Sequence, residues 1–125
     1  VQRFSRSKIN SLHEKYSLKS KKELKIRSNA IIIRAKYLAE KHGFTFNKIS
    51  TRLMKSRWGS CSYHNNISIN ICLSDLPQRL IDCVILHELM HTRIKNHSVY
   101  FWSELNNLVE DLKGLRKELK EDYFL

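Results

Sequence analysis

The residues His87-Glu88-Leu89-Met90-His91 have the types and the spacing that can bind and use a metal ion. Residues four apart in a helix lie one turn apart and about 40° around the axis, so the two imidazoles lie side by side. Two such imidazoles can bind one zinc ion, and the glutamate between them is placed to act as a base toward water. The spacing predicts His87 and His91 as zinc ligands and Glu88 as the catalytic acid/base.

The third ligand is predicted to be His97, six residues after His91. In an unbroken helix this histidine would be turned by about 240° and displaced by about 9 Å, so the helix must end before it. Asn96 tolerates the left-handed conformation of a helix end, and Ser98 can begin the next helix at once. Glu110, on that following helix, is the alternative ligand.

The opposing interpretation is a helix that carries two histidines and no metal. The apolar run 80–86 before the motif is typical of a buried helix, and a third histidine follows the motif. Both features favour a metal site. Two other histidines are better explained locally, His42 as a helix-terminal residue and His64 as part of a turn.

The segments around the motif predict an α+β domain. Ser20 and Glu23 have the spacing of a capping box, and Gly43 can end the helix that they begin. Alternating apolar residues predict strands, and further helices follow them. The predicted elements are a helix over 20–42, strands within 44–54, 57–62 and 67–74, the metal-binding helix over 77–95, a helix from 98, and a last helical piece over 115–123. Strands and helices are segregated, so we expect a small antiparallel sheet packed on the helices, with the metal between sheet and helix.

Length and composition predict a single domain over residues 1–125, with 1–19 as a basic N-terminal extension that is either flexible or partly helical. The chain begins at Val1, and we expect a longer native N-terminus. Three cysteines without a C-x-x-C pair indicate a reducing compartment, and Cys61 is the one expected near the metal cleft. No signal peptide and no membrane-length apolar run is visible, so we expect a cytoplasmic protein without a membrane partner.

The positive charge is concentrated in the first half of the chain. Residues 1–57 hold sixteen Lys or Arg and three acids, a net charge of +13. Residues 58–125 hold seven Lys or Arg and nine acids, a net charge of −2. The basic half can bind nucleic acid or another polyanion, and the simpler interpretation is a solvated lysine-rich surface.

Several motifs in this order resemble the YgjP-like metal-dependent hydrolases, which are zincins related to the SprT-like proteases. The motifs are R-W-G-S-C-S over 57–62, the segment 67–77, H-E-L-M-H over 87–91, and N-H-S-V-Y-F-W over 96–102. The resemblance covers about residues 20–112. It implies a small zincin-like fold, zinc held by His87, His91 and His97, Glu88 as acid/base, and a peptidase activity. The chain departs from the family in lacking a β-rich region before the first helix and the proline-containing segment after F-W.

These motifs favour a zinc-dependent metallopeptidase. Trp58, Gly59 and Ser60 are expected to bind substrate by presenting a strand edge to an extended peptide. A tyrosine, Tyr63 or Tyr100, is a candidate to hold the oxyanion.

The alternative to a metallopeptidase is a nucleic-acid-associated basic protein with a structural or vestigial zinc site. A structural site has four protein ligands, and no fourth Cys or His lies at close spacing, which favours the open catalytic site. The two interpretations combine in a protease that acts on nucleic-acid-bound protein.

Overall fold

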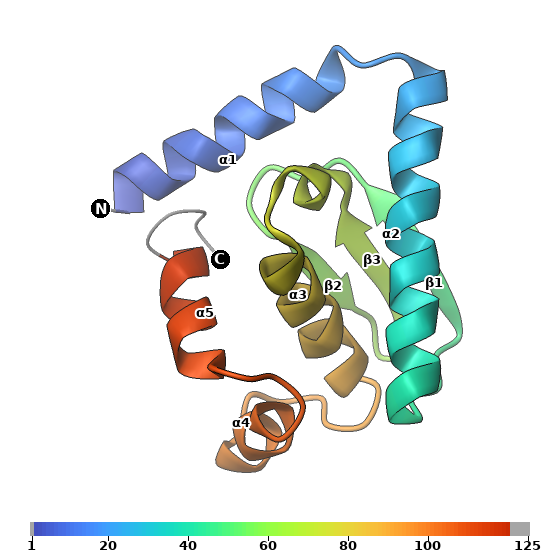
Figure 1. Cartoon of the computed structure of the whole chain (residues 1–125), viewed down its shortest axis with the longest axis vertical. Helices are drawn as coiled ribbons and strands as arrows, with labels where there is room; N and C mark the ends of the chain where they lie inside the picture. The colour runs from blue at the N-terminus through green and yellow to red at the C-terminus, as the bar shows by residue number, and fades with distance from the viewer. Residues whose placement is uncertain (1, 121–125) are drawn as a thin grey trace.

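The computed structural model describes residues 2–120, with side chains from residue 9 onward, and shows helices and strands in the order expected of an α+β protein (Figure 1). The elements are α1 (Gln2–Ser17), α2 (Lys21–His42), β1 (Lys48–Arg52), β2 (Gly59–Cys61), β3 (Asn66–Asn70), the 3-10 helix η1 (Ile71–Asp75), α3 (Gln78–Met90), α4 (Val99–Asn106) and α5 (Leu112–Glu118). Within this part of the chain, no helix has the length and hydropathy that crossing a membrane requires.

The sheet is mixed, in the strand order β1-β3-β2, where a wholly antiparallel sheet was predicted. β2 and β3 form the expected antiparallel hairpin, with Asn65 in the left-handed conformation at its turn (φ 64°). β1 pairs in parallel with β3, because the loop 53–58 carries the chain past β3 to its other side. The buried side chain of Asn70 holds this loop by donating to the carbonyl oxygens of Met54 and Arg57, at 3.1 and 2.9 Å.

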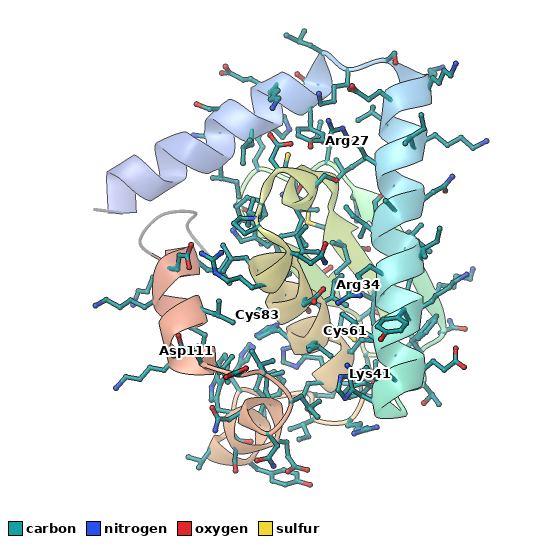
Figure 2. The ribbon with its side chains drawn as sticks, viewed as in Figure 1. Arg27, Arg34, Lys41, Cys61, Cys83 and Asp111 are labelled. Carbon is teal, nitrogen blue, oxygen red and sulfur yellow. The ribbon has the colours of Figure 1, made fainter. Side chains whose placement is uncertain are left out.

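α3 is the central helix of the core. Eight of its residues are buried, and it lies with α2 against one face of the sheet (Figure 1). Arg34 of α2 joins the two helices by donating from Nε and Nη2 to the two carboxylate oxygens of Asp82, at 2.9 and 2.7 Å (Figure 2). The predicted caps of α2 are confirmed, since the Ser20 side chain accepts from the Glu23 N–H and Gly43 has a φ of 72°.

Three helix and strand ends differ from the predictions. β3 ends at Asn70, because its side chain accepts from the Cys72 N–H and starts η1. α3 ends at Met90 and not at 95. The last helix begins at Leu112 and not at residue 115, directly after Asp111 in the left-handed conformation (φ 56°). The predicted end of the last helix, at residue 123, lies outside the described residues.

The first nineteen residues include a full helix, α1, which a polar network fastens to the rest of the protein. Ile9 and Tyr16 are fully buried. The Tyr16 hydroxyl donates to Asp75 and accepts from Arg27 Nη1 at 3.0 Å, and Lys15 donates to Asp75 at 2.7 Å (Figure 2). Burial by itself would raise the pKa of Asp75, but these hydrogen bonds and the Arg27 charge hold that pKa below its usual value.

We predict that Tyr16→Phe lowers the free energy of unfolding by about 2 kcal/mol, because the hydroxyl bonds a carboxylate in a part-buried site. Urea denaturation would measure the change, with Tyr37→Phe as the control, since Tyr37 is 51% exposed. The contribution of Asp75 is present at neutral pH and is lost as pH falls through its depressed pKa. The difference between wild type and Tyr16→Phe should therefore shrink below about pH 4. Equal losses in the two variants would show that the network does not anchor α1.

Candidate metal centre

Three histidines converge at the end of α3. His87 lies in the last turn of α3, His91 directly follows its final residue, and His97 returns from the loop beyond. The Nε2 atom of His97 lies 3.0 Å from Nε2 of His91 and 3.2 Å from Nε2 of His87. All three offer ligand atoms within 4.8 Å of one another. The structure thus brings together the three predicted ligands.

The donor set fits a tetrahedral zinc ion. With Zn–N bonds of about 2.05 Å, tetrahedral ligand nitrogens lie about 3.3 Å apart, close to the spacing observed here. His91 Nδ1 lies 2.9 Å from the Ile94 carbonyl oxygen, to which it donates, so its Nε2 lone pair faces the other two rings. His87 Nδ1 lies 3.0 Å from Glu88 Oε2, which orients that ring in the same way. Three histidines leave a fourth position for water or substrate.

The return of His97 depends on a tight turn and not on Asn96. The expected left-handed residue is absent there, because the described non-glycine residues with positive φ are Asn65 and Asp111. Instead, the N–H groups of residues 91–93 bond to carbonyls three residues earlier, which tightens the chain into a 3-10 turn that ends the helix early.

Two cations fasten the turn to distant parts of the fold. Arg93 donates to the carbonyl oxygens of His42 and Gly43 at the end of α2, at 3.2 and 2.8 Å. Lys95 donates to the Ser62 carbonyl at 3.0 Å and to the Asn65 side chain, both in the β2–β3 turn. These contacts hold the segment that carries His97 against two separate elements.

Aromatic side chains of α4 enclose the histidines. Phe101 is stacked on His91 at 4.5 Å between ring centroids, and Trp102 is stacked on His97 at 5.5 Å. Ser98 caps α4 by accepting from the Phe101 N–H, as predicted. Burial lowers the pKa of both His91 and His97, which favours the neutral imidazole that binds a metal.

Glu88 is buried against the edge strand β2. Its side chain occupies space that exists because residue 59 is a glycine: a Cβ there would lie 2.8 Å from Glu88 Cγ. Trp58 is fully buried and belongs to the core, and its carbonyl oxygen accepts from the Asn70 N–H at 2.9 Å, so the predicted contact of Trp58 with substrate is not available in this structure. Gly59 and Ser60 lie in β2, which is an end strand of the sheet.

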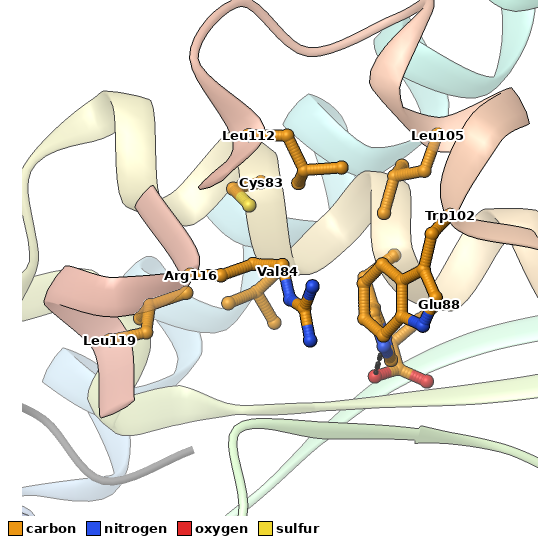
Figure 3. A pocket seen from close by; sticks show the side chains of 9 residues that line it. Cys83, Val84, Glu88, Trp102, Leu105, Leu112, Arg116 and Leu119 are labelled. Carbon is orange, nitrogen blue, oxygen red and sulfur yellow. Dashed lines mark hydrogen bonds and ion pairs between the residues drawn. The ribbon is translucent and has the colours of Figure 1, made fainter. Parts of the chain in front are cut away.

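A small cavity of about 10 Å³ lies beside His87 and Glu88, between α3, α4 and α5 (Figure 3). That volume is about the minimum for one water molecule. Its apolar lining includes Cys83 and Val84 of α3, and the Arg116 guanidinium of α5 enters it 3.6 Å from the centre of the Trp102 ring. The Arg116 charge also contributes to the lowered pKa of His97.

The other candidates are two exposed tyrosines, and a cysteine and a glutamate outside the cluster of ligand atoms. Tyr63 and Tyr100 are 82% and 62% exposed. Cys61 is half-buried on β2, where burial raises the pKa of its thiol, and it is not among the clustered ligand atoms of the described residues. Glu110 is exposed and is likewise outside that cluster.

Sequence reasoning named Gly59 as a substrate-binding residue but missed its role beside Glu88, and it missed Arg116 entirely. The role of Gly59 in making room for Glu88 needs a long-range contact, although a glycine within a strand is a signal for close approach. Arg116 lies nineteen residues after His97, and no spacing rule links it to the motif.

We predict that His97→Ala sharply lowers zinc affinity, because two imidazoles remain where three converge. Glu110→Ala should leave zinc affinity unchanged and serves as the matched control. Zinc competition titration with a chromophoric chelator would measure both variants. The assignment of His97 is wrong if Glu110→Ala loses zinc and His97→Ala retains it.

Comparisons with known proteins give the family and the fold of the chain. Residues 4–122 match the family described as YgjP-like, metallopeptidase domain. The crystal structure of the metallopeptidase zymogen of Pyrococcus abyssi abylysin is similar in fold, with a TM-score of 0.62 at 19% identity over 72% of this chain and 91% of that one. The crystal structure of the metallopeptidase zymogen of Methanocaldococcus jannaschii jannalysin has a TM-score of 0.51 at 28% identity, over 78% of this chain and 91% of that one.

No curated protein sequence shows a significant match. The two solved structures support the predicted α+β, zincin-like fold. The family match spans nearly the whole chain, including every residue of the candidate centre. The chain therefore belongs to the YgjP-like metallopeptidase family and is a metal-dependent hydrolase.

Proposed function

We propose that this protein hydrolyses peptide bonds with a zinc ion held by His87, His91 and His97 and with Glu88 as the general base. The observation that carries the proposal is the convergence of three Nε2 atoms, 3.0 and 3.2 Å apart, next to the buried carboxylate of Glu88. The chemistry that zinc would supply at such a site is a bound water whose pKa is lowered toward about 7, and polarisation of the substrate carbonyl.

Glu88 would move the protons of the reaction. Its carboxylate accepts a proton from the attacking water and later donates it to the leaving nitrogen. The contact with His87 Nδ1 orients the carboxylate, and the absence of a side chain at Gly59 leaves room for it. Burial at 5% exposure keeps bulk water away from it, which strengthens its electrostatic interactions.

β2 would position the substrate. It is an end strand, it pairs with β3 along one edge, and it lies close to Glu88. An extended peptide can pair with the other edge through main-chain hydrogen bonds, which need no particular substrate side chain. A peptide bound in this way would have a scissile carbonyl near the three histidines, and we expect activity on unfolded or extended protein segments.

We predict that Glu88→Gln retains zinc and loses about 10²- to 10⁴-fold in turnover, because the amide keeps the shape of the side chain and cannot accept the proton. Zinc content and hydrolysis of a fluorogenic, unstructured protein would be measured on the same preparation. A variant that hydrolyses this substrate at the wild-type rate would remove Glu88 from the mechanism. Loss of zinc would instead assign it to the metal site.

We predict that Gly59→Ala lowers turnover by about 100-fold and leaves zinc content unchanged, since its Cβ would displace the Glu88 side chain by roughly 1 Å. Ser50→Ala, on the exposed face of the same sheet, is the matched control and should have wild-type activity. If Gly59→Ala retains full activity, the close contact between β2 and Glu88 does not position the base.

A further inference from the structure

The face of the sheet that is turned away from α2 and α3 is polar and basic. The inner face carries Ile67 and Ile69, which are buried. Lys48, Ser50 and Arg52 alternate with the inward residues of β1 and are all exposed. The register places Ser50, Ser68 and Ser60 directly across from one another, which makes a row of hydroxyls over the three strands. The helices cover the other face (Figure 1).

Cations at this face have no acidic partners. Residues 41–74, which include the whole sheet, contain no aspartate or glutamate. Lys48, Arg52, Lys55 and Arg57 are exposed, and no ion pair among the described side chains involves them. Other cations of the basic half are neutralised within the fold, for example Lys15 by Asp75 and Arg34 by Asp82.

The loop that carries Lys55 and Arg57 is held in place. The buried Asn70 amide donates to the main chain on both sides of Lys55, at Met54 and at Arg57. This loop follows Arg52 directly, so Arg52, Lys55 and Arg57 lie within six residues of sequence at one end of β1, and Lys48 lies at its other end. Cations on a fixed main chain lose less conformational entropy when they bind a charged partner.

We propose that this surface binds the phosphate backbone of duplex nucleic acid without sequence preference. The surface consists of Lys48, Arg52, Lys55 and Arg57 together with the serine row. Lys48 and Arg52 lie about 13 Å apart along the strand. That separation is comparable to the major groove width of about 12 Å, so the two cations can contact phosphates on both sides of a groove. Serine hydroxyls are ordinary phosphate donors. The residues that the three strands place on this face include no aromatic side chain on which single-stranded bases would stack.

An anionic membrane is the less favoured partner. Peripheral membrane binding becomes stronger with the apolar area that enters the interface, in addition to the attraction of cations to anionic lipids. Within residues 48–57, which carry these cations, Leu53 is the large apolar residue that is exposed, at 38%. The surface also lies on the side of the sheet opposite to α3, so bound nucleic acid leaves the three histidines accessible (Figure 1).

The test is fluorescence anisotropy of the whole chain with a labelled, arbitrary-sequence DNA duplex of about 20 base pairs, in salt from about 50 to 200 mM. Four phosphate contacts predict a slope of log K against log salt of about −3.6. The double variant Lys48→Gln/Arg52→Gln removes two of these phosphate contacts and should flatten the slope to about −1.8. The matched control Lys21→Gln/Lys22→Gln removes the same charge from exposed positions of α2 and should keep the wild-type slope.

Equal flattening in both double variants would show an unlocalised effect of net charge and overturn the proposal. Absence of duplex binding at low salt, or binding to anionic phospholipid vesicles in place of the duplex, would overturn it too. The measurement is made with and without EDTA and repeated on Glu88→Gln. Duplex binding should be the same in each case, so its outcome is independent of whether the protein is a zinc peptidase.

Discussion

The turn between His91 and Ser98 is the constraint on which the candidate centre depends. The chain must leave α3, reverse, and return an imidazole to within 3.2 Å of two others in the space of six residues. Local 3-10 hydrogen bonds begin the reversal, but the contacts that hold it are distant in sequence. Arg93 reaches the end of α2, and Lys95 reaches the β2–β3 turn. The site is therefore built only when helix, sheet and loop are all folded.

A second constraint is the close approach of α3 and β2. Glu88 is a buried carboxylate, and burial of a charged group is costly unless its surroundings are arranged for it. A glycine at position 59 leaves the needed space, and the buried Trp58 next to it anchors the strand in the core. The strand that makes room for Glu88 is also the end strand at which we propose that an extended peptide binds. Under that proposal, the same few residues position both the base and the substrate.

The sheet separates two surfaces of different character. One face packs on α2 and α3 and supports the histidines; the other is open, hydroxyl-rich and free of acids over residues 41–74. Asn70 connects the two, since its side chain fixes the loop that carries Lys55 and Arg57 and that leads directly into Trp58 and Gly59. A single buried amide therefore orders both the basic loop and the entry to the edge strand.

The amino-acid sequence by itself determined those features that depend on neighbours along the chain. The helical period placed His87 and His91 on one face with Glu88 between them. Ser20 and Gly43 marked the bounds of α2, and alternation marked β3, because capping and strand patterning are local interactions.

Tertiary structure decided the rest. The parallel pairing of β1 with β3 does not follow from the pattern of either strand, since alternation specifies a face and not a partner. α3 ended at Met90, and the break lacked the expected left-handed Asn96, because the distant contacts of Arg93 and Lys95 hold the turn. The role of Gly59 rests on a 2.8 Å approach between residues far apart in sequence, which becomes defined only when helix and sheet pack together.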